Sequence, residues 1–296
     1  MVQFGRVLTA MVTPFDNKGH IDFVKTTQLV NHLINTGTES LVVAGTTGES
    51  PTLTKEEKIA LFEHVVNVVN NRVPVIAGTG GNNTYASVEL TKKAAQLGVD
   101  GIMVVAPYYN KPNQEGLFQH FKSVAESTEL PIMVYNIPSR SAVNILPETI
   151  IRLAEIPNIV CVKEASGDLN AMTKIIANTP DDFLLYSGDD SMTLPVLAVG
   201  GHGVVSVASH IIGSEMQEMV QAYLSGKNGE AAQLHQELLP LMQGLFLAPN
   251  PTPVKTALQM QGLDVGAVRL PLVPLNEQER GMLFQIVNEI KKSTSH

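Results

Sequence analysis

The chain has 296 residues, 44% of them hydrophobic, and its 28 acidic residues outnumber its 20 basic ones, giving a formal net charge of −8. This hydrophobic content argues against a disordered chain, and an acidic balance without runs of Lys or Arg argues against nucleic acid as a partner. No segment is long and apolar enough to cross a membrane, and the amino-terminal residues lack a signal-peptide pattern. We therefore expect a soluble cytoplasmic protein whose single cysteine, Cys161, is a small buried side chain.

Short apolar segments alternate along the chain with segments in which apolar residues recur at helical spacing. The eight apolar segments are 7–12, 41–44, 73–77, 102–106, 131–135, 159–163, 183–186 and 203–207. In the helical segment 55–66, Thr54 and Glu57 have the spacing of a capping box. Eight strands that alternate with helices predict a (β/α)8 TIM barrel of the α/β class. A doubly wound open sheet is the alternative, but no Gly-x-Gly-x-x-Gly follows the first strand.

The strand pattern stops after about Gly226, and only helical patterns follow. These patterns cover 230–247, 253–261 and 276–292, with a turn rich in Pro and Asn at 248–253. We therefore predict two parts, a (β/α)8 catalytic barrel over residues 1–225 and a C-terminal helical extension over residues 226–296. We expect the extension to serve packing or assembly rather than chemistry.

Lys163 is the most informative residue, because it ends the apolar segment 159–163. A lone ammonium is costly to bury in a strand of a parallel sheet. Desolvation lowers the pKa of a lysine, and the neutral amine is the form that attacks a carbonyl. An ion pair with Glu164 is the alternative, although neighbours on a strand point to opposite faces. The position indicates a lysine that forms a Schiff base.

Other unusual residues follow the predicted strands, at the end where barrel enzymes place their catalytic groups. The clusters are 45–50, 78–82, 107–112, 135–140 and 187–190, and they are rich in Gly, Thr, Tyr, Asn and Asp. Each cluster alone has a structural explanation, because glycines make tight turns and tyrosines pack while half-buried. Their repetition at the same end of several strands favours an active site there.

The turn Gly-Thr-Thr-Gly at 45–48 offers backbone N–H groups and two hydroxyls that can hold an anion. No Gly-Lys-Ser/Thr follows, so a small carboxylate fits this turn better than a nucleotide. The histidines show neither His-x-His nor His-x-x-x-His spacing, and there is no cysteine pair, so we expect no metal site. We expect Glu49 and Asp189 to cap helices and accept hydrogen bonds. A reactive lysine is also compatible with pyridoxal phosphate, but no segment is dedicated to phosphate binding, so we expect no cofactor.

Four motifs occur in the order Gly-Thr-Thr-Gly-Glu-Ser, Pro-Tyr-Tyr-Asn-Lys-Pro, Tyr-Asn-Ile-Pro-Ser-Arg and Val-Lys-Glu-Ala-Ser-Gly-Asp. Together they resemble the dihydrodipicolinate synthase family, and the resemblance covers essentially the whole chain. The first and last motifs are shared with N-acetylneuraminate lyase and 2-keto-3-deoxy-sugar-acid aldolases, so the middle two discriminate better. The resemblance implies a 4-hydroxy-tetrahydrodipicolinate synthase of the diaminopimelate route to lysine. Lys163 would form a covalent imine with pyruvate, whose enamine attacks L-aspartate 4-semialdehyde.

The resemblance also implies roles for the tyrosines and for one threonine. Tyr135 matches the family's proton-transfer tyrosine, Thr47 the hydroxyl that links two tyrosines, and Tyr109 the second tyrosine of the pair. In this family the second tyrosine reaches into the neighbouring subunit's site. A dimer is then the expected minimal active unit, and a homotetramer of two dimers is the expected assembly. We assign Tyr108 to subunit packing.

Substrate binding is implied for residues from several predicted loops. Thr46 and Thr47, with their backbone N–H groups, would hold the carboxylate of pyruvate. Arg140 would bind the carboxylate of the aldehyde substrate, where a planar fork is useful; a surface or interface ion pair is its alternative role. Gly188 and Val205 would offer backbone carbonyls near the substrate.

Three residues depart from the pattern of family members that lysine inhibits. Those members tend to carry histidines after the first turn and a glutamate near the Gly-Thr-Gly loop. This chain has Lys55, Lys58 and Ala86 at these places. Two cations would repel a lysine effector, and the missing carboxylate removes a partner for its ammonium. We therefore predict weak or absent feedback inhibition.

Two other functions remain open at this point. A sibling aldolase would use the same lysine with a different aldehyde, although sugar-acid aldolases need hydroxyl-binding groups where this chain has Arg140. A catalytically silent binding or regulatory barrel would be expected to lose Lys163 or Tyr135, and both are present.

Overall fold

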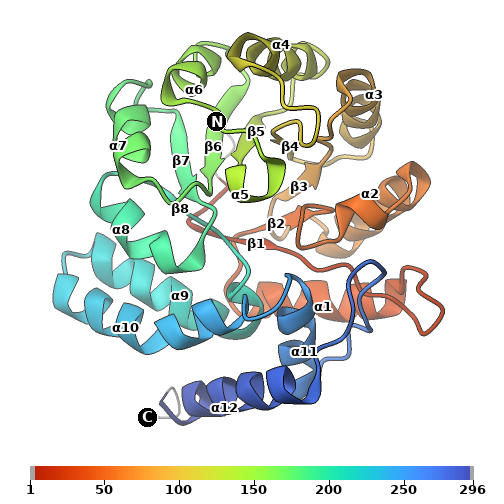
Figure 1. The fold of residues 1–296 in the computed structure, drawn as a ribbon, viewed down its shortest axis with the longest axis vertical. Helices are drawn as coiled ribbons and strands as arrows, with labels where there is room; N and C mark the ends of the chain where they lie inside the picture. The colour runs from red at the N-terminus through yellow and green to blue at the C-terminus, as the bar shows by residue number, and fades with distance from the viewer. Residues whose placement is uncertain (1–3, 294–296) are drawn as a thin grey trace.

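The computed structural model describes residues 4–293, and its centre is a closed barrel of eight parallel strands. Each strand pairs with the next one in the chain, and β8 pairs with β1 to close the ring (Figure 1). The strands are β1 Val7–Ala10, β2 Ser40–Val43, β3 Val75–Gly78, β4 Gly101–Val105, β5 Ile132–Asn136, β6 Ile159–Glu164, β7 Leu184–Ser187 and β8 Gly203–Ser206. The predicted (β/α)8 barrel is therefore confirmed, and the open sheet is excluded.

Helices form a ring outside the strands (Figure 1). They are α1 Phe23–Asn35, α2 Lys55–Val69, α3 Thr84–Ala95, α4 Gln114–Ala125, α6 Pro147–Leu153, α7 Leu169–Ala177, α8 Thr193–Ala198 and α9 Ser209–Leu224. The short helix α5 Pro138–Ser141 lies inside this ring, over the strands (Figure 1). The C-terminal helices are α10 Asn228–Gly244, α11 Thr252–Met260 and α12 Glu277–Ser293. Helices α10 and α11 pack against α9, and α12 packs against α10 and α11. No helix among the described residues has the length and apolar character needed to cross a membrane.

The strand side chains alternate between two hydrophobic clusters, as strands buried on both faces do. The cluster inside the barrel consists of Phe4, Leu8, Ala10, Val42, Ile76, Met103, Met133, Tyr135, Cys161, Tyr186 and Val205. The larger cluster lies between the strands and the helices. Cys161 is fully buried in the interior cluster, as predicted. Because side chains on a strand alternate, Lys163 points to the same side as Cys161.

Several helices begin at residues whose side chains hold the first turn. Thr54 and Glu57 form the predicted capping box at the start of α2. The side chains that cap α1, α3, α4 and α7 each accept a hydrogen bond from the backbone N–H three residues later; they are Asp22, Asn83, Asn113 and Asp168. Such caps satisfy N–H groups that have no partner inside the helix. They also fix where each strand-to-helix loop ends, and these loops carry the polar residues of the site.

Candidate active site

Lys163 lies near the end of β6 with 5% of its surface exposed. Its Nζ atom is 4.3 Å from the ring centre of Tyr135. Burial lowers the pKa of Lys163 to about 8, so a much larger fraction of neutral amine is present near pH 7 than for a free lysine. The predicted alternative, an ion pair with Glu164, is not formed. The Glu164 carboxylate instead accepts hydrogen bonds from Asn136 Nδ2 at 3.0 Å and from the backbone N–H of Ser166 at 2.8 Å.

Asp190 is a charged residue near Lys163 that the sequence analysis did not single out, although the cluster at 187–190 contains it. It is buried and accepts hydrogen bonds from the Ser206 hydroxyl and from the backbone N–H groups of Val207 and Ala208, the latter two at 3.0 Å. Burial raises the pKa of Asp190 despite these bonds. Its charge raises the pKa of Lys163 and so opposes the effect of burial on the amine. Asp190 therefore moderates how far the amine pKa falls.

Tyr135 lies on β5 directly beside Lys163 in the register of the two strands. Its side chain is buried, and burial raises the pKa of the phenol to about 12. A hydrogen bond with Thr46 and the positive charge of Arg140 both act to lower that pKa. The phenol is therefore protonated at neutral pH and can donate a proton within a short distance of the amine.

Thr47 does not contact Tyr135 in the way that was expected. The tyrosine's hydrogen-bond partner is Thr46, one residue earlier. The Thr47 hydroxyl is instead buried, and its Oγ1 atom accepts a hydrogen bond from Asn250 Nδ2 at 2.9 Å. Consecutive side chains in a tight turn point in different directions, so only one of the two threonines can face the tyrosine. The structure therefore favours Thr46 as the neighbour of Tyr135, and a role for Thr47 between the tyrosines stays a prediction.

Thr46, Tyr108, Tyr135 and Arg140 are among the residues that line a cavity of about 220 Å³, whereas Lys163 is not among them. Arg140 reaches it from the short helix α5 and is itself exposed. Among the described residues that line the cavity, Tyr109 does not appear. It is 88% exposed and adopts a left-handed backbone conformation with φ of 72°. The structure thus brings Arg140 to Tyr135 and Thr46, while Tyr109 points outward.

Gly188 and Val205, whose backbone carbonyls are expected to face the substrate as acceptors, lie near the ends of the neighbouring strands β7 and β8. Gly188 follows β7, and a Cβ atom at this position would lie 2.6 Å from Ala165 Cβ and 3.2 Å from Lys163 Cε. Glycine is therefore needed for the lysine side chain to keep its position. Val205 is buried on β8 in the cluster inside the barrel.

Glu49 and Asp189, for which capping was expected, behave differently. Asp189 caps the short 3-10 helix η2 (Asp190–Met192), since its carboxylate accepts a hydrogen bond from the backbone N–H of Ser191. Glu49 makes no capping hydrogen bond with its side chain, and its carboxylate pairs with Lys255 at 2.7 Å. Within the described part of the chain, no group of three or more His, Cys, Asp and Glu side chains is arranged to hold a metal ion.

Comparison with known proteins agrees with this site. The Dihydrodipicolinate synthetase family matches residues 3–290. The 4-hydroxy-tetrahydrodipicolinate synthase of Bacillus velezensis is 64% identical over 286 residues, which cover 97% of this chain and 99% of the relative. A dihydrodipicolinate synthase crystal structure from Bacillus anthracis has a TM-score of 0.96 at 63% identity and covers 97% of this chain and 99% of its own.

A more distant structure shows a bound small molecule. It is the chloride-inhibited dihydrodipicolinate synthase of Acinetobacter baumannii complexed with pyruvate, with a TM-score of 0.95 at 40% identity. The match covers 98% of this chain and 99% of the Acinetobacter baumannii chain. The matches extend over nearly the full length of the chain at high identity. The chain therefore belongs to the dihydrodipicolinate synthetase family.

Proposed function

We propose that this chain is a 4-hydroxy-tetrahydrodipicolinate synthase, which condenses pyruvate with L-aspartate 4-semialdehyde in the diaminopimelate route to lysine. The observation that carries the proposal is the buried Lys163, whose pKa falls to about 8 beside the protonated phenol of Tyr135. Close relatives with the same activity and a pyruvate complex of a family member support it. The reaction needs no cofactor, because the imine on Lys163 supplies the electron sink.

The lysine chemistry follows from the neutral amine. Nζ of Lys163 attacks the keto carbon of pyruvate, and loss of water from the adduct gives the protonated imine. The imine draws electrons from the methyl group, which loses a proton to give the enamine. The enamine carbon attacks the aldehyde carbon of L-aspartate 4-semialdehyde. The amine of that substrate then adds to the imine carbon, closes the ring and releases Lys163.

Proton movement falls to Tyr135 and its partner Thr46. A phenol whose pKa is about 12 holds its proton at neutral pH and can donate it to the oxygen that leaves as water. The Thr46 hydroxyl accepts or returns that proton through its hydrogen bond with the phenol. The relay therefore runs through Thr46, with Thr47 beside it on the same turn.

Two carboxylates have to be held during the reaction. The turn at Thr46 and Thr47 receives the carboxylate of pyruvate through hydroxyl and backbone N–H groups. Arg140, at the mouth of the cavity, binds the carboxylate of the aldehyde substrate with its planar fork. Gly188 and Val205 contribute backbone carbonyls near the reacting carbons.

The active assembly is a homotetramer of two dimers in the cytoplasm. An 88% exposed tyrosine held in a left-handed conformation, Tyr109, suits contact with a second copy of the chain. It would complete the proton path of the neighbouring subunit's site. Sedimentation of the protein across a range of concentrations tests the assembly independently of the chemistry.

Turnover of pyruvate with L-aspartate 4-semialdehyde, coupled to dihydrodipicolinate reductase and followed as nicotinamide oxidation, tests the function. Turnover with this aldehyde supports the synthase. Absence of turnover, with pyruvate still trapped on Lys163 by borohydride, would move the chain to a sibling aldolase with another aldehyde.

A further inference from the structure

A buried ion pair joins the C-terminal extension to the turn that follows β2. Lys255 Nζ on α11 lies 2.7 Å from Glu49 Oε1, and the two side chains are 2% and 1% exposed. Nζ also donates a hydrogen bond to the backbone carbonyl of Ala267 at 2.9 Å. Removing one partner of such a pair leaves a charge buried without compensation, which is strongly unfavourable. Glu49 directly follows the segment 46–48 that carries the two threonines of the site.

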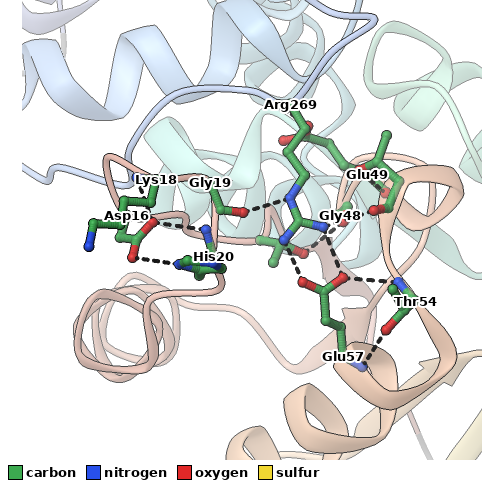
Figure 2. Close-up of polar contacts among 11 residues, drawn as sticks. Asp16, Lys18, Gly19, His20, Gly48, Glu49, Thr54, Glu57 and Arg269 are labelled. Atoms are coloured by element: carbon green, nitrogen blue, oxygen red, sulfur yellow. Dashed lines mark hydrogen bonds and ion pairs between the residues drawn. The ribbon is translucent and has the colours of Figure 1, made fainter.

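The second oxygen of Glu49 is also held from the C-terminal extension. Glu49 Oε2 accepts a hydrogen bond from the backbone N–H of Arg269 at 2.8 Å. The side chain of Arg269 in turn donates to both carboxylate oxygens of Glu57 at 2.9 and 2.5 Å and to the Gly19 carbonyl at 2.8 Å. Figure 2 shows Arg269 between the loop that contains Gly19 and the start of α2. The backbone N–H that Glu49 accepts from is therefore itself fixed in place.

A third contact reaches the turn from the same extension. Asn250 is buried, and its Nδ2 atom donates to Thr47 Oγ1 at 2.9 Å. The Oδ1 atom of Asn250 is buried without a hydrogen-bond partner among the described residues. The Asn250 amide therefore binds Thr47, and Asn250, which lies outside the barrel, orients the Thr47 hydroxyl.

The turn needs such support because its own backbone is not a relaxed one. Glu49 has φ of 55°, in the left-handed region that residues other than glycine rarely adopt. A side chain at Gly48 would be crowded, since its Cβ atom would lie 3.1 Å from the Met11 carbonyl oxygen and from Ala44 Cα. Within the turn, the Glu49 backbone N–H donates to the Thr46 carbonyl at 3.0 Å. A conformation of this kind persists when surrounding contacts hold it.

We propose that Lys255 and Asn250 are positioning residues for pyruvate, acting through Glu49 and Thr47 on the turn that receives the pyruvate carboxylate. The Lys255 ammonium neutralises Glu49, so that a substrate carboxylate can approach the neighbouring N–H groups and hydroxyls without repulsion. Asn250 directs the Thr47 hydroxyl. The inference rests on the proposed pyruvate chemistry, and it makes the C-terminal extension part of the pyruvate site.

Lys255→Met tests the ion pair, and Lys25→Met is its matched control. Lys25 also joins the barrel to the extension, through Asp264 at 2.6 Å, but the Asp264 side chain is 65% exposed and lies outside the turn. The readout is the pyruvate concentration that gives half-maximal trapping on Lys163 with cyanoborohydride, measured by mass spectrometry. We expect Lys255→Met to raise it by about tenfold or more and Lys25→Met to leave it unchanged. The KM for the aldehyde should change little in either variant, whereas a purely structural role would lower the yield of folded protein at unchanged half-saturation.

Two further variants keep the inference testable if Lys255→Met does not fold. Asn250→Ala removes one hydrogen bond and should raise the half-saturating pyruvate concentration by about three- to tenfold. The double variant Glu49→Gln/Lys255→Met has no buried charge, keeps an acceptor for the Arg269 N–H and should shift less than Lys255→Met alone. Unchanged half-saturation in Asn250→Ala, or in Lys255→Met when that variant folds, would overturn the inference. Failure of the unmodified protein to trap pyruvate would instead overturn the proposed function.

Discussion

Two of the described lysines are buried, Lys163 at the end of β6 and Lys255 in α11, and they share more than their burial. Nζ of Lys163 is 4.3 Å from the ring centre of Tyr135, and Nζ of Lys255 is 4.2 Å from that of Phe15. Burial lowers the pKa of both amines. They differ in their anions, because Lys255 contacts a carboxylate at 2.7 Å whereas Lys163 forms no ion pair within residues 4–293.

This difference in the neighbouring carboxylate indicates which property distinguishes the nucleophilic lysine. Burial, an aromatic neighbour and a lowered pKa occur at both sites, so none of them alone identifies a reactive lysine. The Glu49 carboxylate contacts the Lys255 amine directly and opposes the effect of burial, although the pKa of Lys255 still falls to about 8, as that of Lys163 does. The carboxylate that acts on Lys163, Asp190, is itself bound by the Ser206 hydroxyl and by two backbone N–H groups. Its charge therefore moderates the amine pKa without occupying the amine.

Covalent labelling is the most direct test of the difference between Lys163 and Lys255. Reduction with borohydride in the presence of pyruvate should modify Lys163 and leave Lys255 unmodified, as peptide mass mapping would show. Lys163→Ala should abolish the adduct and lower turnover by at least about 10³-fold, because the imine is the only electron sink in the mechanism. An adduct on Lys255, or one that persists in Lys163→Ala, would contradict the assignment.

Replacing each lysine by methionine should change the free energy of unfolding differently. Lys255→Met should lower stability by about 3 kcal/mol, because it leaves the Glu49 carboxylate buried without its partner. Lys163→Met removes a lone buried amine at nearly constant length and should leave stability unchanged or raise it by about 1 kcal/mol. Urea unfolding of both variants at one protein concentration measures this. Equal destabilisation by the two changes would show that Lys163 also holds the fold together.

The pH dependence of imine formation sharpens the comparison further. Only the neutral amine attacks pyruvate, and the pKa of Lys163 is lowered to about 8, so protonation removes the reactive form as the pH falls below that value. The second-order rate constant for imine formation should therefore rise about tenfold per pH unit below pH 8 and level off above it. Cyanoborohydride trapping at low pyruvate gives this rate constant. A profile that still rises steeply between pH 9 and about pH 10 would mean an amine with the ordinary pKa of a free lysine.

The smallest effect concerns two further lysines, Lys55 and Lys58, at the start of α2. Lys55 is exposed, whereas Lys58 is partly buried and has a pKa lowered by that burial. Their positive charges, with Ala86 in place of a carboxylate, should keep L-lysine from binding, so turnover should not change at sub-millimolar L-lysine. A clear inhibition curve in that range would contradict the prediction.

The residues on the barrel strands could be predicted because their surroundings are local in sequence. A β-branched apolar segment that ends in Lys163 and is followed by Glu164 is enough to place the amine at the end of a buried strand. The strand register then fixes Tyr135 beside it without further information. The eightfold alternation of strand and helix patterns predicted the barrel for the same reason, since periodicity reflects which face each segment buries.

The turn after β2 could not be resolved from sequence. Whether Thr46 or Thr47 faces Tyr135 depends on backbone angles such as the left-handed φ of Glu49. The residue types in the turn do not predict these angles. The hydrogen bond from Asn250 to Thr47 joins residues 203 positions apart, and the one from Arg269 to Glu49 spans 220 positions. Pairings at such separations leave no periodic pattern.

One signal for the second lysine was nevertheless present in the sequence. Lys255 lies in Val-Lys-Thr-Ala-Leu, a largely apolar stretch, and so resembles Lys163 in Val-Cys-Val-Lys-Glu. A cation in an apolar segment is worth the same attention in a helix as in a strand, because burial of the charge has to be compensated in both.

The order in which a ribosome makes this chain gives the contacts of the C-terminal extension a further consequence. A nascent chain that has completed β8 contains all eight strands and the residues Lys163, Tyr135 and Arg140. It still lacks Asn250 and Lys255, on which the pyruvate turn depends under the inference above. During synthesis the reactive amine would thus be assembled before the site that selects its substrate, and the enzyme would gain its affinity for pyruvate only with the last quarter of its residues.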